Sequence, residues 1–325
     1  MSYIINCAKK LALLNLKHKA IVLESTVYPS ATIEFFKIVN RNNRYILGKN
    51  MFLGYSPERE NPGDKNFSYK KTPKIISGST PNCLKVMENI YSHIIKKIVK
   101  AKNIEAAEAS KLLENLYRAV NIGLVNEFKI ICDKLKLDIF EIINLASTKN
   151  FGFQKFLPGP GLGGHCIPID PYYLSWISNK FGYDPKFIKL SGELNRSMPE
   201  WVVRKMLKNI NKKNPKILLL GISYKKNVDD DRESPAFAIM KILEKKKIMF
   251  DYNDPYFNNL RQGRQSKLKK KSVTLNKKNL KKFDGVLIIT DHDKYDYKYV
   301  ARNSKQIFDS RGVYKKYNFK NIIYC

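Results

Sequence analysis

A single cysteine, Cys166, lies in the segment PGPGLGGHCIPIDP at residues 158–171, a setting that favours reactivity. Backbone N–H groups of a glycine-rich turn stabilise an anion, and the dipole of a helix starting near Pro171 favours a thiolate. The segment therefore predicts a thiol presented to a ligand. His165 is adjacent, but neighbouring side chains in an extended loop usually point apart, so we leave it out of the catalytic set.

A second group of candidates is polar and lies near helix ends or on one helix face. Lys111 and Asn115 are four residues apart in a predicted helix, so both side chains project from one face and could hold or polarise an oxygen. A solvated helix face is the simpler interpretation of the same pair. Asp170 stands directly before Pro171, where an N-cap is an equally plain role.

Two further candidates follow predicted strands. Glu58 lies in SPEREN and Thr26 in ESTVYP, each just after an apolar segment. Ligands of α/β sheets bind at the carboxyl ends of strands, so Glu58 could act as a general base. A turn carboxylate is the alternative for Glu58, and Thr26 rests on the same positional argument.

The elements that must position these residues alternate between strand and helix patterns. The amino-terminal part has predicted strands at 20–24, 52–56 and 74–77 with helices at 32–39 and 81–95, which indicates a mainly parallel sheet. One long helix at 104–135 follows, and its length favours a role between domains or against a second subunit. Further helices are predicted at 138–146, 171–179 and 185–211.

A second alternating unit begins at residue 216, with strands at 216–221, 248–252, 283–290 and 306–309 and a helix at 235–244. We therefore expect an α/β protein with domains at 1–103, 104–212 and 213–325. Residues 159–164 satisfy G-x-G-x-x-G but follow Phe-Leu-Pro, so they are not a dinucleotide fingerprint, and the sequence has no other match.

Composition limits the remaining function classes. No apolar run is long enough for a membrane span or a convincing signal peptide, so a cytoplasmic location is the default. The five cysteines are scattered without a CxxC pair, so we expect no disulfide framework and no metal site. The net charge of +31 is spread along the chain without a nucleic-acid motif, and we expect no specific nucleic-acid partner.

Several segments together resemble the UDP-glucose/GDP-mannose dehydrogenase family over nearly the whole chain. They are ESTVYPSAT, GYSPERENPG, AEASKLLENLYRAVNIGLVNE, PGPGLGGHCIPIDPYYL, GISYKKNVDDDRESPA, NDPY, TDHDKYD and FDSRGVY. The forms GLGGHCIPIDP and SPERENPG are most similar to the branch that oxidises UDP-N-acetylhexosamines, such as UDP-N-acetylglucosamine 6-dehydrogenase. The resemblance implies a partial amino-terminal Rossmann-like NAD-binding domain, a central long-helix dimerisation domain and a carboxyl-terminal Rossmann-like UDP-binding domain.

The reaction implied by the resemblance is a two-step oxidation of the C6 hydroxymethyl of a UDP-sugar to a carboxylate, with NAD as hydride acceptor. Cys166 matches the nucleophile that forms a thiohemiacetal and then a thioester. Lys111 matches the residue that stabilises the oxyanion, and Asn115 matches a substrate-positioning residue. Asp170 matches the carboxylate that assists the lysine and the hydrolytic water. Glu58 matches the acid/base residue of thioester hydrolysis, with Thr26 near the water and the cofactor.

The resemblance also implies binding residues. Gly161, Gly163 and Gly164 match positions where backbone approaches the sugar. Tyr224 and Lys225 match the part of the carboxyl-terminal domain that meets the nucleotide sugar. Arg311 matches a substrate-binding arginine and Arg232 an arginine that reaches the dinucleotide, and a guanidinium suits either anion because it offers paired donors. Without the resemblance, both arginines would be assigned as surface ion-pair partners.

The chain departs from the family pattern at its start. The first strands and the GxGxxG turn of the NAD-binding domain are missing, which predicts an unpaired sheet edge and an exposed apolar face. Two hypotheses follow: a nucleotide-sugar dehydrogenase, or an inactive truncated remnant that at most binds nucleotide sugar or dimerises. We expect UDP-sugar binding without turnover from the chain alone.

Overall fold

The computed structural model describes residues 1–60, 72–164, 167–261 and 268–325. The chain divides into two compact units, which are treated separately below. The first comprises residues 1–117 and 169–185, and the second comprises residues 118–168 and 186–325. Cys166 and His165, on which the sequence argument begins, lie outside the described residues.

The first unit contains a four-stranded sheet of β1 (Lys19–Leu23), β2 (Met51–Tyr55), β3 (Lys74–Gly78) and β4 (Ile98–Lys100), in that order. β1 pairs with β2 and β3 with β4 in parallel, whereas β2 and β3 are antiparallel. The expectation of a mainly parallel sheet therefore misses the central pair. Parallel neighbours need a crossover, usually a helix, and residues 56–73 carry no helical apolar pattern.

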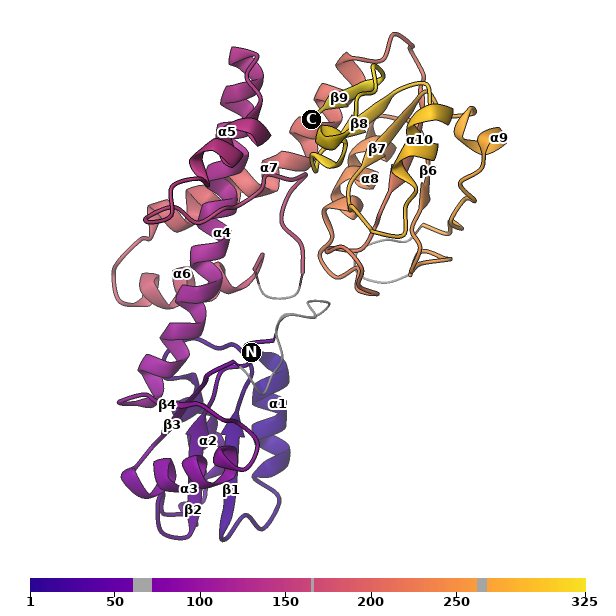
Figure 1. Ribbon diagram of the computed structural model, residues 1–325. Coiled ribbons are helices and arrows are strands. Elements are labelled where there is room, and N and C mark those ends of the chain that lie inside the picture. The colour runs from indigo at the N-terminus through magenta and orange to yellow at the C-terminus, as the bar shows by residue number, and fades with distance from the viewer. Residues whose placement is uncertain (61–71, 165–166, 262–267) are drawn as a thin grey trace. The chain divides into compact units, whose positions relative to one another are not determined.

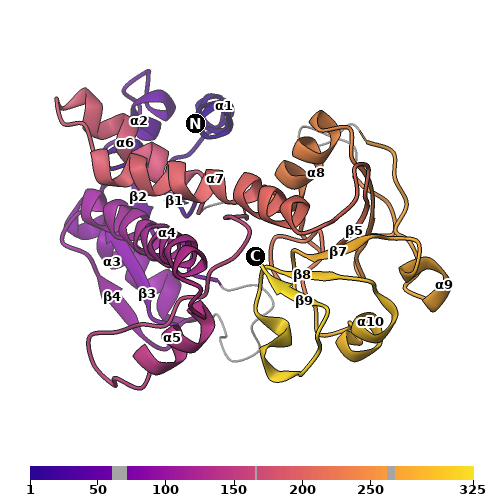
Figure 2. The same cartoon turned by 90° about the horizontal axis from the view of Figure 1, so that it is seen from above.

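Helices cover both faces of this sheet (Figures 1 and 2). α1 (Ser2–Leu11) and α2 (Ala31–Val39) share a buried cluster with Leu23, Met51 and Tyr55. On the other face, α3 (Pro81–Ser92) packs Met87 and Tyr91 against Ile76.

Two predictions about the first unit meet different outcomes. α3 starts as predicted with proline in its first turn, and Thr80 caps it by accepting a hydrogen bond from the Cys83 N–H. The prediction of an exposed apolar face is wrong, because α1, which the sequence analysis did not predict, packs Ala8 into the cluster over it. β1 is nevertheless a terminal strand of the sheet, as expected.

The long helix is present as predicted. α4 runs from Ile104 to Leu135, with residues 104–117 in the first unit and 118–135 in the second. α5 (Ile139–Ala146) follows, capped by Asp138 through the Phe140 N–H, then α6 (Asp170–Lys180) in the first unit and α7 (Lys186–Lys208) in the second.

The second unit carries a five-stranded, fully parallel sheet in the order β6-β5-β7-β8-β9. Its strands are β5 (Lys216–Leu220), β6 (Met249–Asn253), β7 (Gly285–Ile288), β8 (Ile307–Asp309) and β9 (Ile322–Tyr324). Its helices are α8 (Pro235–Lys245), α9 (Lys277–Leu280), α10 (Tyr297–Asn303) and a 3-10 turn, Val313–Lys316. α10 and β9 were not predicted.

Alternate residues of the interior strand β5 enter opposite cores of this sheet. Ile217 and Leu219 join α7 and α8 in one buried cluster, while Leu218 and Leu220 join α10 in another. Figure 2 shows α8 and α10 on the two sides of the sheet. A strand buried on both faces reads as a continuous apolar run, which is why KILLL was predicted as a strand. The carboxyl ends of β5, β6 and β7 consequently lie at one edge.

Candidate functional site

In the first unit, α4 and α6 bring predicted catalytic residues together. The Asn115 side-chain amide donates a hydrogen bond to Asp170 Oδ2 at 2.5 Å, across 55 positions of sequence. Lys111 lies one helical turn before Asn115, and its charge acts on the same carboxyl group. The face of α4 that carries Lys111 and Asn115 is thus directed at a carboxylate and is not merely solvated.

Asp170 is buried, with only 3% of its surface exposed. Burial raises the pKa of its carboxyl group to about 6, although the Asn115 hydrogen bond and the Lys111 charge act in the opposite direction. The N-cap interpretation of Asp170 is wrong. Ile169 is the N-cap of α6, and Asp170 is the first residue of the helix with its side chain bonded to Asn115.

Thr26 and Glu58 follow neighbouring strands, as predicted. β1 and β2 are parallel partners that pair Leu23 with Tyr55, so the loops after them emerge at the same edge of the sheet. The Glu58 N–H donates to the Glu24 carbonyl at 3.4 Å, which joins the two loops.

The loop that carries Glu58 is also tied to α4. Arg59 forms an ion pair with Glu114 of α4 and donates to the Pro73 carbonyl at 3.1 Å. Within the first unit, α4 therefore contacts both the loop that carries Glu58 and the side chain of Asp170.

A buried lysine next to Glu58 was missed by the sequence analysis. Lys74, at the start of β3, is 3% exposed, and its Nζ lies 2.9 Å from Glu24 Oε1 and 3.6 Å from Glu58 Oε2. A buried cation requires compensating charge, and these two carboxylates provide it. The signal available in the sequence was a lysine at the first position of a strand in which two isoleucines follow it.

In the second unit, the glycine-rich loop is held by an asparagine of α4. Asn126 Oδ1 accepts from the Gly159 N–H at 2.9 Å, and its amide donates to Asn195 Oδ1 at 3.0 Å. Residues 147–164 include no strand or helix, so the G-x-G-x-x-G match at 159–164 is not a strand-to-helix turn.

The glycines of this loop lie against the segment that follows β5 and the start of α8. A Cβ on Gly163 would lie 2.8 Å from the Cβ of Tyr224, and one on Gly164 would lie 2.9 Å from the Tyr224 ring. Gly161 has a φ of +135° and faces Pro235 and Pro199. The Gly164 N–H also donates to the Arg232 carbonyl at 3.0 Å. The predicted sugar-facing glycines and Tyr224 are therefore neighbours.

The two predicted arginines have carboxylate partners. Arg311 Nε lies 3.1 Å from Asp291 Oδ1, and the Arg311 backbone N–H donates to Asp309 Oδ1. Arg232 forms a fork with Asp230, with its Nη2 at 2.6 Å from Oδ2. Burial works to raise the pKa of Asp230, but the Arg232 hydrogen bonds and charge outweigh it and the pKa falls below its usual value. Lys225 directly follows Tyr224 and is half-buried.

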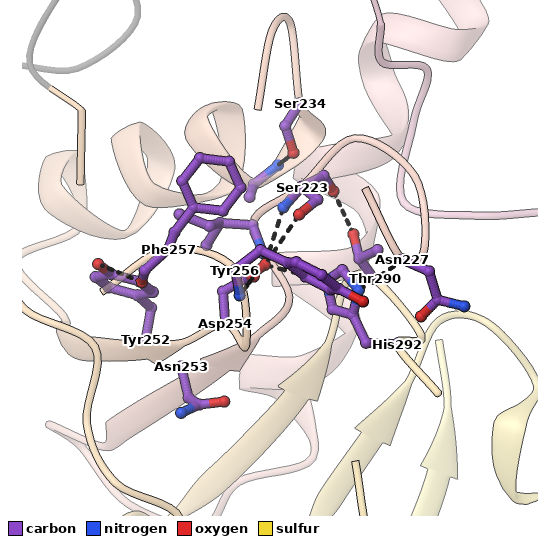
Figure 3. A network of polar contacts seen from close by, with 12 residues as sticks. Ser223, Asn227, Ser234, Tyr252, Asn253, Asp254, Tyr256, Phe257, Thr290 and His292 are labelled. Atoms are coloured by element: carbon purple, nitrogen blue, oxygen red, sulfur yellow. Dashed lines mark hydrogen bonds and ion pairs between the residues drawn. The ribbon is translucent and has the colours of Figure 1, made fainter. Parts of the chain in front are cut away.

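A buried polar network at the carboxyl edge of the second sheet was also missed (Figure 3). Asp254, just after β6, accepts hydrogen bonds from the Ile222 N–H at 2.7 Å and the Ser223 N–H at 3.1 Å. His292, after β7, places Nε2 3.1 Å from the same carboxylate. Burial opposes ionisation of Asp254, but the hydrogen bonds outweigh it and lower its pKa. The segments NDPY and TDHDKYD contain both residues, yet neither was singled out.

The turn between β1 and α2 lacks the features of a dinucleotide site. The pyrophosphate of NAD needs a glycine-rich turn between a strand and a helix. β1 leads into α2 through residues 24–30, ESTVYPS, which contain no glycine. That turn therefore does not fit a pyrophosphate.

Within the described ranges, no cluster of three or more His, Cys, Asp or Glu side chains could hold a metal ion. The same ranges include no helix that is both long and apolar enough to cross a bilayer.

Together these features describe a two-sheet α/β protein whose polar residues gather at strand ends and on α4, as in nucleotide-dependent enzymes. The chain belongs to the UDP-glucose/GDP-mannose dehydrogenase family. Residues 1–95 match the model of its NAD binding domain, residues 105–197 its central domain and residues 218–316 its UDP binding domain. The predicted family and α/β fold class are confirmed.

Curated relatives are similar over most of the chain. The protein CapL of Staphylococcus aureus is 34% identical over 307 residues, which cover 90% of this chain and 70% of CapL. A UDP-N-acetyl-D-glucosamine 6-dehydrogenase of Pseudomonas aeruginosa is 36% identical over 247 residues, covering 74% of this chain and 58% of that protein. This chain thus matches between 58% and 70% of the length of these two relatives.

Solved structures share the fold. A UDP-D-ManNAc dehydrogenase from Pyrococcus horikoshii has a TM-score of 0.86 at 26% identity, covering 99% of this chain and 76% of that one. A UDP-N-acetyl-mannosamine dehydrogenase from S. aureus has a TM-score of 0.82 at 30% identity, covering 99% and 74%. None of these comparisons supports the alternative of an inactive remnant.

Proposed function

We propose that this chain acts in the NAD-dependent oxidation of the C6 hydroxymethyl group of a UDP-sugar to a carboxylate. The substrate class is a UDP-N-acetylhexosamine, in line with the activities named for the relatives from P. aeruginosa and P. horikoshii. When bound, NAD+ would accept the hydride removed in each oxidation. The observation that carries the proposal is the Asn115–Asp170 hydrogen bond beside Lys111, because it places a cation, an amide and a buried acid together.

Each member of this group has a role that its chemistry suits. Lys111 stabilises the negative charge that develops on the substrate oxygen, which is effective where water is excluded. Asp170, with a pKa raised to about 6, exchanges a proton near neutral pH and serves the lysine and the hydrolytic water. Asn115 orients the Asp170 carboxylate and positions substrate.

The covalent steps belong to Cys166. Its thiolate adds to the C6 aldehyde to form a thiohemiacetal, and the second oxidation leaves a thioester that water hydrolyses to the acid and the free thiol. Glu58 takes the proton from that water, with Thr26 beside it. Lys74 supports this role of Glu58 because it keeps a positive charge 3.6 Å from the carboxylate.

The nucleotide sugar is assigned to the second unit. The loop with Gly161, Gly163 and Gly164 offers backbone at close range to the segment of Tyr224 and Lys225. Arg311 contributes a guanidinium that suits an anionic substrate. Arg232, with its exposed fork to Asp230, is assigned to the dinucleotide.

We also infer a homodimer through α4. Large apolar side chains remain exposed along this helix, including Leu113 (64%), Leu124 (60%), Phe128 (42%) and Leu135 (62%). An apolar stripe of this length on a helix is typical of a surface that another subunit covers.

The substrate assignment is tested by calorimetry and thiol protection. UDP-N-acetylglucosamine and UDP-N-acetylmannosamine should bind, whereas GDP-mannose should bind weakly or not at all. Bound UDP-sugar should slow iodoacetamide alkylation of Cys166, measured by peptide mass spectrometry, while exposed Cys7 serves as an internal control. Absence of both heat and protection would contradict the assignment.

The reaction is tested by product analysis. Where the protein turns over NAD+, two NADH should form for each uronic acid released, because the oxidation removes four electrons. Cys166→Ser should abolish acid formation and retain UDP-sugar binding, and Cys7→Ser should leave both unchanged. Acid formation by Cys166→Ser would remove that residue from the nucleophile role.

A further inference from the structure

The segment after the interior strand β5 is held at both of its ends by residues that follow the neighbouring strands β6 and β7. At its start, the Ile222 and Ser223 N–H groups and the Ser223 hydroxyl donate to Asp254 Oδ2 at 2.7–3.2 Å. The Ser223 carbonyl also accepts from the Thr290 hydroxyl at 2.6 Å. Residues 222–227 include Tyr224 and Lys225, which the proposed function assigns to the nucleotide sugar. Figure 3 shows Ser223, Asp254, Thr290 and His292 close together in this network.

The far end of the segment is held by His292. The Asn227 N–H donates to His292 Nδ1 at 3.0 Å, so Nδ1 carries a lone pair. Nε2 therefore bears the hydrogen and donates to Asp254 Oδ2 at 3.1 Å. A neutral imidazole in this single tautomer links both ends of the segment. Neither His292 nor Asp254 is more than 2% exposed, so water does not replace these bonds.

The backbone at the end of the segment is bent. Asn227 has a φ of +61°, in the left-handed region that asparagine enters more readily than most residues other than glycine. Its side chain adds bonds to the Asp293 N–H at 3.0 Å and to Asp293 Oδ2 at 2.5 Å. The Tyr224 N–H also donates to the Asp230 carbonyl at 2.9 Å across the bend. His292 holds the Asn227 N–H from the buried side.

We propose that His292, oriented by Asp254, is a positioning residue for binding of the UDP-sugar, because it fixes the loop that carries Tyr224 and Lys225. The inference rests on the proposed function, which assigns this loop to the nucleotide sugar. His292 touches no substrate itself. Its contribution is pre-organisation, since a loop already in its binding conformation loses less entropy when ligand binds.

Two substitutions separate the functions of the two ring nitrogens. His292→Asn places an amide oxygen near the position of Nδ1, so the Asn227 N–H keeps an acceptor while the bond to Asp254 is lost. His292→Gln places an amide nitrogen near the position of Nε2, so the bond to Asp254 is kept while the Asn227 N–H loses its acceptor. Exposed His93, in the first unit, provides the matched controls His93→Asn and His93→Gln.

The readouts are the Kd for UDP by calorimetry, the melting temperature, and hydrogen exchange of residues 222–227 in the unliganded full chain. We expect His292→Gln to weaken UDP binding about tenfold and to accelerate exchange in the loop, since one hydrogen bond is worth about 1.4 kcal/mol in such a case. His292→Asn should retain affinity to within about threefold. The two variants should show similar melting temperatures.

The inference would be overturned if His292→Gln bound UDP and exchanged its loop amides as wild type does. It would also be overturned if both His292 variants lost UDP affinity equally and their melting temperatures fell in parallel. Asn227→Gly keeps the positive φ and the N–H that His292 Nδ1 accepts, and it covers the case in which His292 variants do not fold. UDP affinity should stay within about threefold of wild type, and a larger loss would assign the positioning to the Asn227 side chain and overturn the inference. If the wild-type chain binds no UDP, the proposed function fails. Hydrogen exchange of residues 222–227 in the His292 variants still tests whether His292 fixes this loop.

Discussion

At the scale of single residues, the most informative side chain in the described structure is Asp170. It is a buried acid that accepts a hydrogen bond from Asn115 and lies within the charge field of Lys111, yet burial still raises its pKa to about 6. An acid whose ionised form is disfavoured by burial lowers the free energy of unfolding at neutral pH. Perturbed carboxyl groups of this kind cluster at catalytic sites because the perturbation serves proton transfer.

Asp170→Asn should therefore stabilise the protein at high pH. The folded-state pKa lies above the ordinary value of 3.8, so stability is fully present below about pH 4 and falls as pH rises through about 6. The wild-type cost at pH 8 is about 3 kcal/mol at most, and the amide removes it. The measurement is the free energy of unfolding in urea at pH 4 and pH 8 for both proteins.

The matched control is Asp184→Asn, an exposed side chain of the same unit that carries the same charge. It should not produce a comparable gain at pH 8. A lower unfolding free energy for Asp170→Asn than for wild type at pH 8 would show that the ionised carboxylate stabilises the fold.

At the scale of elements, the glycine-rich loop packs closely against the segment after β5. Gly163 and Gly164 allow the loop backbone to lie against Tyr224, and the Gly164 N–H bonds to the Arg232 carbonyl. These contacts link the loop that leads to Cys166 with the segment assigned to the nucleotide.

Gly164→Ala should weaken UDP-sugar binding about tenfold or more, because a Cβ would lie 2.9 Å from the Tyr224 ring and push the two segments apart. Gly152→Ala is the control. Gly152 also has a positive φ, of +66°, but its Cβ would meet only Lys149 Nζ at 3.9 Å. Both variants should lose about 1 kcal/mol of stability from backbone strain, and only Gly164→Ala should lose affinity by calorimetry. Equal affinities would contradict the packing argument.

The exposed face of α4 leads to a prediction about assembly. Leu124→Glu combined with Phe128→Glu should convert a dimer to a monomer, because a stripe of apolar contacts does not tolerate two buried charges. Sedimentation velocity measures the change as a halving of molecular mass. Lys134→Glu, at an exposed position of the same helix, should leave the mass unchanged. A wild-type chain that sediments as a monomer would refute the proposed α4 dimer.

At the scale of the whole molecule, the dominant property is the net charge of +31. A field of this size attracts polyanions generally and raises the local concentration of a doubly charged nucleotide. It does not by itself select a ligand.

Binding of UDP should weaken roughly three- to tenfold between 50 and 500 mM NaCl, because salt screens the long-range attraction. Uridine, which lacks the phosphates, should show no such dependence in the same calorimetric titration. UDP affinity that is independent of salt would show that capture of the nucleotide is governed by local contacts alone.

Much of the fold could be predicted because it depends on local patterns. The continuous apolar run KILLL predicted β5, and the apolar repeat along 104–135 predicted α4. α1 was missed because its short apolar stretch was considered only as a signal segment. The antiparallel pair β2–β3 was missed because strand direction depends on the path of the connection and not on strand composition.

Sequence alone indicated the family through contiguous motifs. Periodicity indicated β5, α4 and the spacing that puts Lys111 and Asn115 on one helix face. Tertiary structure decided that Asp170 is a buried partner of Asn115 and not a helix cap, and that His292 and Asp254 clamp the segment after β5. The reason is physical. Burial and hydrogen bonding between residues 38 or 55 positions apart depend on how helices and strands pack, and no local pattern specifies that packing.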